Sequence, residues 1–318
     1  MPFSEFASVD LDILLTGSQP PRRVGPRILT VGSGSRGDGK TAIAWLLAQT
    51  LSRLGRKTAL IDADLSAAGI YDRVKNMDAD KSLRLFLQRQ QDINILTQAT
   101  FSKNLFLITG SAEISRHNQL AFAAKQKLLT QLRRLKADCV VIDAGAGSSY
   151  FHLDLFLAAD FPIVVTQPSS EALLQAYQFI RTGFFRKLQP LARHWRDLYG
   201  YITTLGDLAP RGAIKTVPDF MRTHDLTHAH VCEVVGSGLH AYRPVILVNQ
   251  SGADQEIEKR QLLLVLLEKI MGIKAINGGK IRPDERLVKG LSQGKPQLML
   301  GGAAGEDIGE MVRKYLMV

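Results

Sequence analysis

The 318-residue sequence is poor in cysteine, in long apolar runs and in aromatic residues, and each scarcity excludes a class of protein. Its two cysteines, Cys139 and Cys232, exclude a disulfide framework and a cysteine-based zinc site. No apolar run approaches the roughly 20 residues that a membrane-spanning helix needs. Aromatic residues make up 7% of the chain and are not interleaved with basic ones, as a surface that stacks on nucleic-acid bases requires. We therefore expect no sequence-specific binding of nucleic acid.

Basic residues, in contrast, are in excess, with 40 Lys and Arg against 30 Asp and Glu and a net charge of +10. This balance favours an acidic partner, such as an anionic membrane surface, DNA bound without sequence preference, or an acidic protein. For any single basic cluster, the alternative is a solvated helix face. The N-terminus carries Glu5, Asp10 and Asp12 and no early basic residue, unlike a secretory signal. The sequence therefore predicts a cytoplasmic protein, with the inner face of the membrane as an alternative location.

The most informative segment is the glycine-rich stretch 32–41, Gly-Ser-Gly-Ser-Arg-Gly-Asp-Gly-Lys-Thr. From Gly34 to Thr41 it fits the phosphate-binding pattern G-x-x-x-x-G-K-[ST], between an apolar run at 28–31 and a helical pattern at 42–54. Glycine allows backbone N–H groups to surround a phosphate, and the helix that follows offers its positive end. The alternative is a glycine-rich turn without a ligand. The residues predicted to contact nucleotide here are Gly34, Ser35, Gly37, Asp38, Gly39, Lys40 and Thr41.

Lysine, threonine and acidic side chains supply the chemistry that this loop needs. Lys40 is predicted to reach the β- and γ-phosphates and to stabilise their charge during hydrolysis, and the Thr41 hydroxyl to ligate Mg²⁺. The apolar run 57–62 ends at Asp62, which forms a D-x-D pair with Asp64. We expect Asp62 to hold metal-bound water and Asp64 to orient an attacking water. The alternative is a pair of loop acids at the end of a strand.

Two further apolar runs end in polar residues. The first ends at Asp143, which is predicted to belong to the Mg²⁺ shell. Gly145 and Gly147 follow it, and Gly147 would let the backbone pass close to the γ-phosphate. The second run ends at Asn249, whose amide can both donate to and accept from adenine. These positions complete a candidate site for a nucleotide and a magnesium ion.

In this order, the motifs resemble those of the MinD/ParA group of P-loop ATPases, and within it the FlhG-like (MinD-like) branch. The resemblance covers about residues 28–190 and 243–297. It implies ATP or ADP with Mg²⁺ as ligands, weak ATP hydrolysis, and an ATP-dependent homodimer with both nucleotides at the interface. It also implies a regulatory protein partner and a role in cell-pole, flagellar or partitioning organisation. The matching segments are Gly34 to Thr41, Asp62 to Leu65, Asp143 to Gly147, Gln167 to Ser170, Ala176 with Tyr177, Asn249, and Ile281 to Leu287.

The chain departs from the family pattern inside the phosphate-binding loop. Ser35 stands where the family has a lysine that reaches into the partner's site, and Arg36 follows it. Arg36 either replaces that lysine, as an arginine finger does, or points into solvent. The departure leaves an alternative function, a nucleotide-binding regulatory scaffold with little or no hydrolysis. A second alternative is a bacterial tyrosine kinase, because segment 36–41 also resembles the P-G-E-G-K-[ST] loop of those enzymes; the tail, however, contains only Tyr315.

Strand and helix patterns alternate after residue 28, which predicts an α/β fold: a doubly wound, mostly parallel sheet with helices on both faces. We expect an N-terminal arm at 1–27 and one P-loop domain at 28–318, with a mainly helical insertion at 191–242. The expected strands are 28–32, 57–62, 104–109, 138–143, 161–166 and 244–249, with a further one near 273–281. The expected helices are 41–55, 115–136, 170–190, 254–271, 284–292 and 305–317.

The last expected helix carries an apolar stripe. Ile308, Met311, Val312, Tyr315 and Leu316 recur at helical spacing. MinD proteins end in an amphipathic helix that binds membrane, and nearby basic residues would suit that role. The other interpretation, which we favour, is a helix docked on the domain.

Overall fold

We describe the fold from a computed structural model, in which residues 1–24, the main part of the predicted arm, lie outside the described part of the chain. Within that part, no helix is both long and apolar enough to cross a membrane. The structure describes residues 25–64, 70, 77–78, 80–83, 86–87, 92–110, 122–192, 216–224, 229–252, 255–295 and 299–316.

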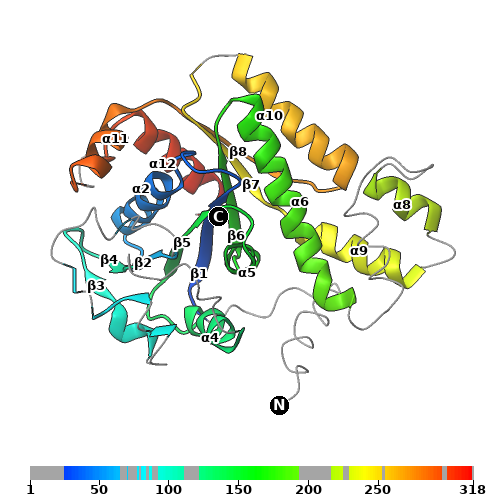
Figure 1. Cartoon of the computed structure of the whole chain (residues 1–318). Helices are drawn as coiled ribbons and strands as arrows, with labels where there is room; N and C mark the ends of the chain where they lie inside the picture. The colour runs from blue at the N-terminus through cyan, green and yellow to red at the C-terminus, as the bar shows by residue number, and fades with distance from the viewer. Residues whose placement is uncertain are drawn as a thin grey trace.

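An eight-stranded sheet in the order β3-β4-β2-β5-β1-β6-β7-β8 forms the centre of the molecule (Figure 1). Every neighbouring pair is parallel except β3 with β4. The strands are β1 (Arg27–Ser33), β2 (Thr58–Asp62), β3 (Gln98–Ala99), β4 (Leu105–Ile108), β5 (Cys139–Ala146), β6 (Phe161–Thr166), β7 (Val245–Asn249) and β8 (Ile276–Ile281). This arrangement confirms the predicted doubly wound, mostly parallel sheet and adds the two-residue β3, which the sequence pattern did not indicate.

The central strands read as continuous apolar runs because helices cover both of their faces. From β1 the chain moves to one side of the sheet through β2 and β4, and later to the other side through β6, β7 and β8. β5 returns between β2 and β1. In such sheets ligands bind at the carboxyl ends of the strands, where the connections diverge. The ends of β1, β2, β5 and β7 therefore define the region in which a site is expected.

The two helical layers pack on separate apolar clusters. One cluster joins α2, α11 and α12 to the sheet, and the others lie beneath α4, α5, α6 and α10, with α9 beside α6 and α8 beside α9 (Figure 1). The helices are α2 (Lys40–Arg53), α4 (Phe122–Leu132), α5 (Tyr150–Leu157), α6 (Ser170–Ala192), α8 (Val217–His224), α9 (Ala229–Ala241), α10 (Gln255–Leu266), α11 (Glu285–Ser292) and α12 (Ala303–Tyr315), with a 3₁₀ turn at Ile93–Leu96 and a π turn at Leu267–Met271.

The expected insertion at 191–242 contains α8 and α9 in its described part. α6 continues through Pro190 to Ala192, two residues beyond its expected end. Val217, Cys232 and Val235 of this segment are buried in the cluster that also contains α6 and α10. We therefore propose that the segment is part of the P-loop domain rather than a separate unit.

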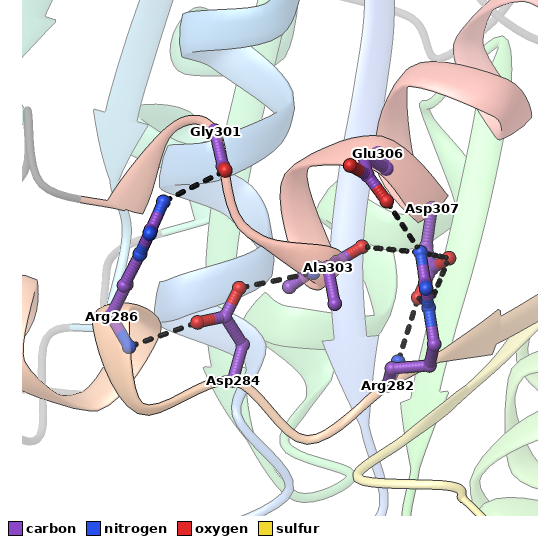
Figure 2. Close-up of polar contacts among 8 residues, drawn as sticks. Arg282, Asp284, Arg286, Gly301, Ala303, Glu306 and Asp307 are labelled. Carbon is purple, nitrogen blue, oxygen red and sulfur yellow. Dashed lines mark hydrogen bonds and ion pairs between the residues drawn. The ribbon is translucent and has the colours of Figure 1, made fainter.

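The C-terminal helix α12 is docked on the domain. Its apolar residues Ile308, Met311 and Val312 are buried in the same cluster as α2. Figure 2 shows the hydrogen bonds and ion pairs that hold it in place. Arg282, which follows β8, donates from Nε to Asp307 Oδ1 (3.0 Å) and from Nη2 to Glu306 Oε2 (2.9 Å). The stripe that could have met a membrane therefore faces the protein core in this structure.

Three further hydrogen bonds in the same region fix the start of α12. The Asp284 carboxylate accepts from the Ala304 backbone N–H (3.1 Å) and from the Arg286 N–H (2.9 Å), and Arg286 Nη1 donates to the Gly301 carbonyl (2.8 Å) (Figure 2). The segment Ile281 to Leu287, which resembles a family motif, thus ties the end of β8 to the C-terminal helix.

Candidate functional site

The glycine-rich loop lies between β1 and α2, as the sequence predicts. Gly39 is the N-cap of α2 and has a left-handed φ of 89°. An added Cβ at Gly39 would lie 2.2 Å from Asn249 Nδ2, so the position requires glycine. Gly34 and Gly37 lie earlier in the loop, Gly34 against the Gln175 backbone of α6. Among the described residues, no side chain caps this end of α2, so its first N–H groups remain available to an anion.

The side chain of Lys40 is buried inside the loop, with 6% of its surface exposed. Its Nζ donates to the Ser35 carbonyl (2.7 Å) and to Ser33 Oγ (3.4 Å). Burial lowers the pKa of Lys40, whereas the carboxylates of Asp143, Asp38 and Asp64 act to raise it. The ammonium group therefore lies at the point where the loop and the acidic strand ends meet.

Asp38 is folded into the loop and is 2% exposed. Its Oδ2 accepts hydrogen bonds from Ser33 Oγ and from Ser35 Oγ, the latter at 2.7 Å. Its backbone carbonyl accepts from Asn249 Nδ2 (2.8 Å). Ser35 and Asp38, both predicted to contact nucleotide, are thus hydrogen-bonded to each other. This contact stabilises the shape of the loop before any ligand binds. Arg36 is exposed at the tip of the loop.

The two strand-end carboxylates Asp62 and Asp143 are opposite each other in the register of β2 and β5. Both are fully buried. Asp62 Oδ2 accepts from the Ile70 N–H (2.7 Å) and Oδ1 from the Asp64 N–H (3.3 Å). Burial, together with the charge of Asp143, raises the pKa of Asp62 to about 7. Asp62 therefore also holds the backbone of Asp64 and Ile70 close to the end of β2.

Asp143 is in a different situation. Neither of its carboxylate oxygens has a hydrogen-bond partner of good geometry in the described part of the chain. Burial raises its pKa, with the Thr41 hydroxyl and the Lys40 ammonium acting in the opposite direction. A buried carboxylate left in this state is costly, and such atoms call for an ion or a water as partner.

Asp64 packs against the turn that follows Asp143. An added Cβ at Gly145, whose φ is 74°, would lie 2.8 Å from Asp64 Cγ, so only glycine allows this approach. Gly147 comes next, and its N–H donates to the Ser33 carbonyl at the start of the loop (3.1 Å). Asp64 is half-buried, and its charge acts to raise the pKa of Lys40. The two segments predicted to surround a γ-phosphate therefore contact each other directly.

The donor set fits magnesium. Mg²⁺ prefers oxygen ligands, and Thr41, Asp62 and Asp143 offer a hydroxyl and two carboxylates, one of them without a partner. Among the residues that the structure describes, no group of three or more His, Cys, Asp or Glu side chains forms a site for another metal.

Asn249 lies beneath the loop and is 2% exposed. Its Nδ2 is used by Asp38, and its Oδ1 is buried without a partner among the described residues. Its predicted contact with adenine stays a prediction. Sequence reasoning assigned no role to three residues here: Ser33, Gln167 as a donor to the Gly37 carbonyl (2.9 Å), and His152 in α5. Ser33 and Gln167 lie inside recognised motifs, whereas His152 had only its position shortly after one to indicate it.

Comparisons with known proteins agree with this geometry. The profile of the ParA family, described as "NUBPL iron-transfer P-loop NTPase", matches residues 26–189, about half of the chain. The septum site-determining protein MinD of Buchnera aphidicola (subsp. Schizaphis graminum) is 27% identical over 153 residues, which cover 45% of this chain and 53% of MinD. The flagellum site-determining protein YlxH of Helicobacter pylori is 27% identical over 157 residues, 49% and 53% of the two chains. The chain thus spans about half the length of these curated relatives.

Solved structures agree on the fold. The septum site-determining protein MinD of Pyrococcus horikoshii, complexed with Mg-ADP, superposes with a TM-score of 0.55 over 91% of this chain and 95% of that one, at 16% identity. The matching family profile, the related sequences and the order of the strands lead to one assignment. The chain belongs to the ParA family of P-loop NTPases, among ATPases of the MinD/ParA type.

Proposed function

We propose that this protein is an ATP-dependent switch of the MinD/FlhG type. The observation that carries the proposal is the preformed loop around Lys40, next to Asp143, a buried carboxylate without a hydrogen-bond partner among the described residues. That arrangement suits a nucleotide phosphate with its magnesium ion. The MinD of Pyrococcus horikoshii, which shares the fold, is complexed with Mg-ADP.

The loop, its lysine and threonine, and the strand-end carboxylates would each have a distinct role. The N–H groups of the loop and of the first turn of α2 bind the phosphates, and Lys40 neutralises charge on the β- and γ-phosphates. Thr41 and Asp143 would hold Mg²⁺, directly or through water, and Asp62 would act through water. When bound, the ion neutralises phosphate charge. Asp64, packed against Gly145, orients the attacking water.

We further propose that ATP favours a homodimer and that hydrolysis dissolves it. The output passes to a regulatory protein partner, with an anionic membrane or nonspecific DNA as further surfaces for the basic chain. The process is cell-pole, flagellar or partitioning organisation, and the location is the cytoplasm or the inner face of the membrane.

A second candidate is a scaffold that binds nucleotide with little or no hydrolysis. One observation favours it: the Ser35 side chain donates to Asp38 inside its own loop, where the family places a lysine directed at the partner. A serine held in this way supplies no cation to a second nucleotide.

The test combines mass measurement by size-exclusion chromatography, in ADP and then in ATP with Mg²⁺, with an assay of phosphate release. A switch gives a dimer in ATP only and slow release that Asp64→Ala abolishes while ATP stays bound. A scaffold binds ATP without release, and autophosphorylation would indicate a kinase. Lys40→Ala is the control: it should lose ATP affinity in isothermal titration and keep its fold. If its affinity equals that of the parent, the loop does not bind phosphate.

A further inference from the structure

The proposed function makes no use of His152, a buried histidine beside the site. His152 lies in the first turn of α5, just after the segment from Asp143 to Gly147. Its backbone N–H donates to Oγ of Ser149, the N-cap of α5 (3.3 Å). Its side chain is 8% exposed. A histidine is thus held at the start of the helix that directly follows the predicted γ-phosphate turn.

The imidazole has both aromatic and polar neighbours. It lies beside Phe151, with ring centroids 6.0 Å apart. The backbone of Ala146 and Gly147 and the charges of Asp64 and Lys40 act on its pKa. Burial is the largest influence and lowers the pKa of His152, so the ring is neutral near pH 7. A neutral imidazole offers one N–H donor and one nitrogen acceptor.

One of these nitrogens has no use in the described structure. His152 Nδ1 is buried and has no hydrogen-bond partner within the described ranges. Asp143, at the start of the same segment, has two unpartnered oxygens. Buried polar atoms of this kind are rare in folded proteins because each one costs free energy. The turn that contains Gly147 lies between Asp143 and His152 in the sequence. A Cβ added to Gly147 would meet nothing within 4 Å among the described atoms, so there is open space at the turn.

We propose that His152 is a positioning residue of the nucleotide site: it holds the Ala146–Gly147 turn toward the γ-phosphate, and the turn that closes on this phosphate supplies the partner that Nδ1 lacks. The inference rests on the proposed nucleotide binding and deepens it. It makes His152 responsible for telling a triphosphate from a diphosphate, because the turn is expected at the γ-phosphate, which ADP lacks.

The test compares a non-hydrolysable ATP analogue (AMPPNP) with ADP, each with Mg²⁺, by isothermal titration on the full chain. His152→Phe keeps an aromatic ring and removes both nitrogens. We expect it to weaken AMPPNP binding about tenfold, the effect of one hydrogen bond, with ADP affinity within about twofold of the parent. His152→Asn, which keeps a polar atom near the position of Nδ1, should restore most of the AMPPNP affinity. His240→Phe, an exposed histidine on α9, is the matched control and should change neither affinity.

The outcomes separate the two proposals. If His152→Phe weakens both nucleotides by the same factor, or neither, His152 is a packing residue and the inference is wrong. His152→Leu, which is smaller and also lacks the nitrogens, carries the same comparison if the Phe variant does not fold. If the parent binds neither nucleotide, the proposed function fails and takes this inference with it.

Discussion

Asp62 and Asp143 are register partners at the carboxyl ends of neighbouring parallel strands, yet their carboxylates are used differently. Asp62 accepts hydrogen bonds from two backbone N–H groups, those of Asp64 and Ile70. The carboxylate oxygens of Asp143 are without partners in the described residues. Of the two, Asp143 is therefore the residue whose burial needs a ligand to be compensated.

The contrast predicts that an Asp→Asn substitution at each of the two positions has opposite effects on the stability of the ligand-free protein. Asp143→Asn should raise the free energy of unfolding by about 1–2 kcal/mol, because it replaces an unpartnered buried carboxylate by a neutral group. It should also remove the effect of Mg²⁺ on nucleotide affinity. Asp62→Asn is the control and should destabilise by a similar amount, because an amide cannot accept both N–H groups equally well. Chemical unfolding in EDTA, with titrations in Mg²⁺, measures both. An Asp143→Asn protein that unfolds more easily than the parent would contradict the assignment.

Stability should also depend on pH through this pair. The folded protein holds the Asp62 proton up to a pKa of about 7, whereas the unfolded chain releases it near the ordinary value of 3.8. The unfolded state therefore binds fewer protons between these values, and the free energy of unfolding falls as the pH rises from about 4 to about 7 and then levels off. Burial of Asp143 acts in the same direction. In EDTA, the difference in unfolding free energy between the parent and the Asp62→Asn/Asp143→Asn double variant should follow this curve; a difference that does not change with pH would contradict it.

The sequence predicted most of the fold and the position of the site because both follow from local patterns. Apolar runs that end in Asp62, Asp143 and Asn249 place these residues at one edge of a parallel sheet, and the glycine-rich loop adds Lys40. The inward fold of Asp38 could not be predicted, because it depends on the loop's own backbone path. The contact between Asn249 and the Asp38 carbonyl joins residues 211 positions apart.

Helix α5 was missed for a local reason. It has only 8 residues, Tyr150–Leu157, and is largely apolar, so its pattern shows no helical alternation. Ser149 was its only start signal. Because α5 was not expected, His152 could not be placed near the γ-phosphate turn from the sequence.

Asn249 should affect the choice of base. Its Oδ1, which has no partner within the described part of the chain, is an acceptor for the adenine amino group, while Nδ2 supports the loop. Asn249→Ala should therefore lower the affinity for ATP more than the affinity for GTP, and so narrow any preference for ATP. The expected size is that of one buried hydrogen bond, about 1–3 kcal/mol. Gln167→Ala, which removes another side-chain contact with the loop, is the matched control and should weaken both equally. Isothermal titration with the two nucleotides measures the ratio, and an unchanged ratio in Asn249→Ala would exclude the adenine contact.

The ion cluster around Asp154 should stabilise the face that carries α4, α5 and α6. Asp154 accepts from Arg186 Nε (2.8 Å) and from Lys125, and all three side chains are largely buried. Burial acts to raise the pKa of Asp154, but these partners lower it overall. Asp154→Ala should lower the free energy of unfolding by about 3 kcal/mol, because two largely buried cations lose a shared carboxylate. Arg222→Ala, which breaks an exposed pair with Asp219, should cost less than about 1 kcal/mol. Urea unfolding compares them, and equal small losses would show that the cluster contributes little.

The last prediction concerns Arg36, which is exposed in the phosphate-binding loop. The proposed dimer would need a cation at the γ-phosphate, and Ser35 is engaged with Asp38. If Arg36 supplies that cation, Arg36→Ala should reduce both ATP-driven dimer formation and phosphate release by at least about tenfold, while the affinity of a single site for ATP changes little. Arg222→Ala removes an exposed arginine elsewhere and should leave all three quantities unchanged.

Ser35→Lys, made alongside, distinguishes the switch from the scaffold. It restores the family's lysine but breaks the hydrogen bond to Asp38, so in a switch that relies on Arg36 it should raise phosphate release only slightly or not at all. In a scaffold, Arg36→Ala should have no effect, and Ser35→Lys should create turnover where there was none. Because the two functions predict opposite responses from adjacent residues, dimer mass and phosphate release measured on both variants decide between them.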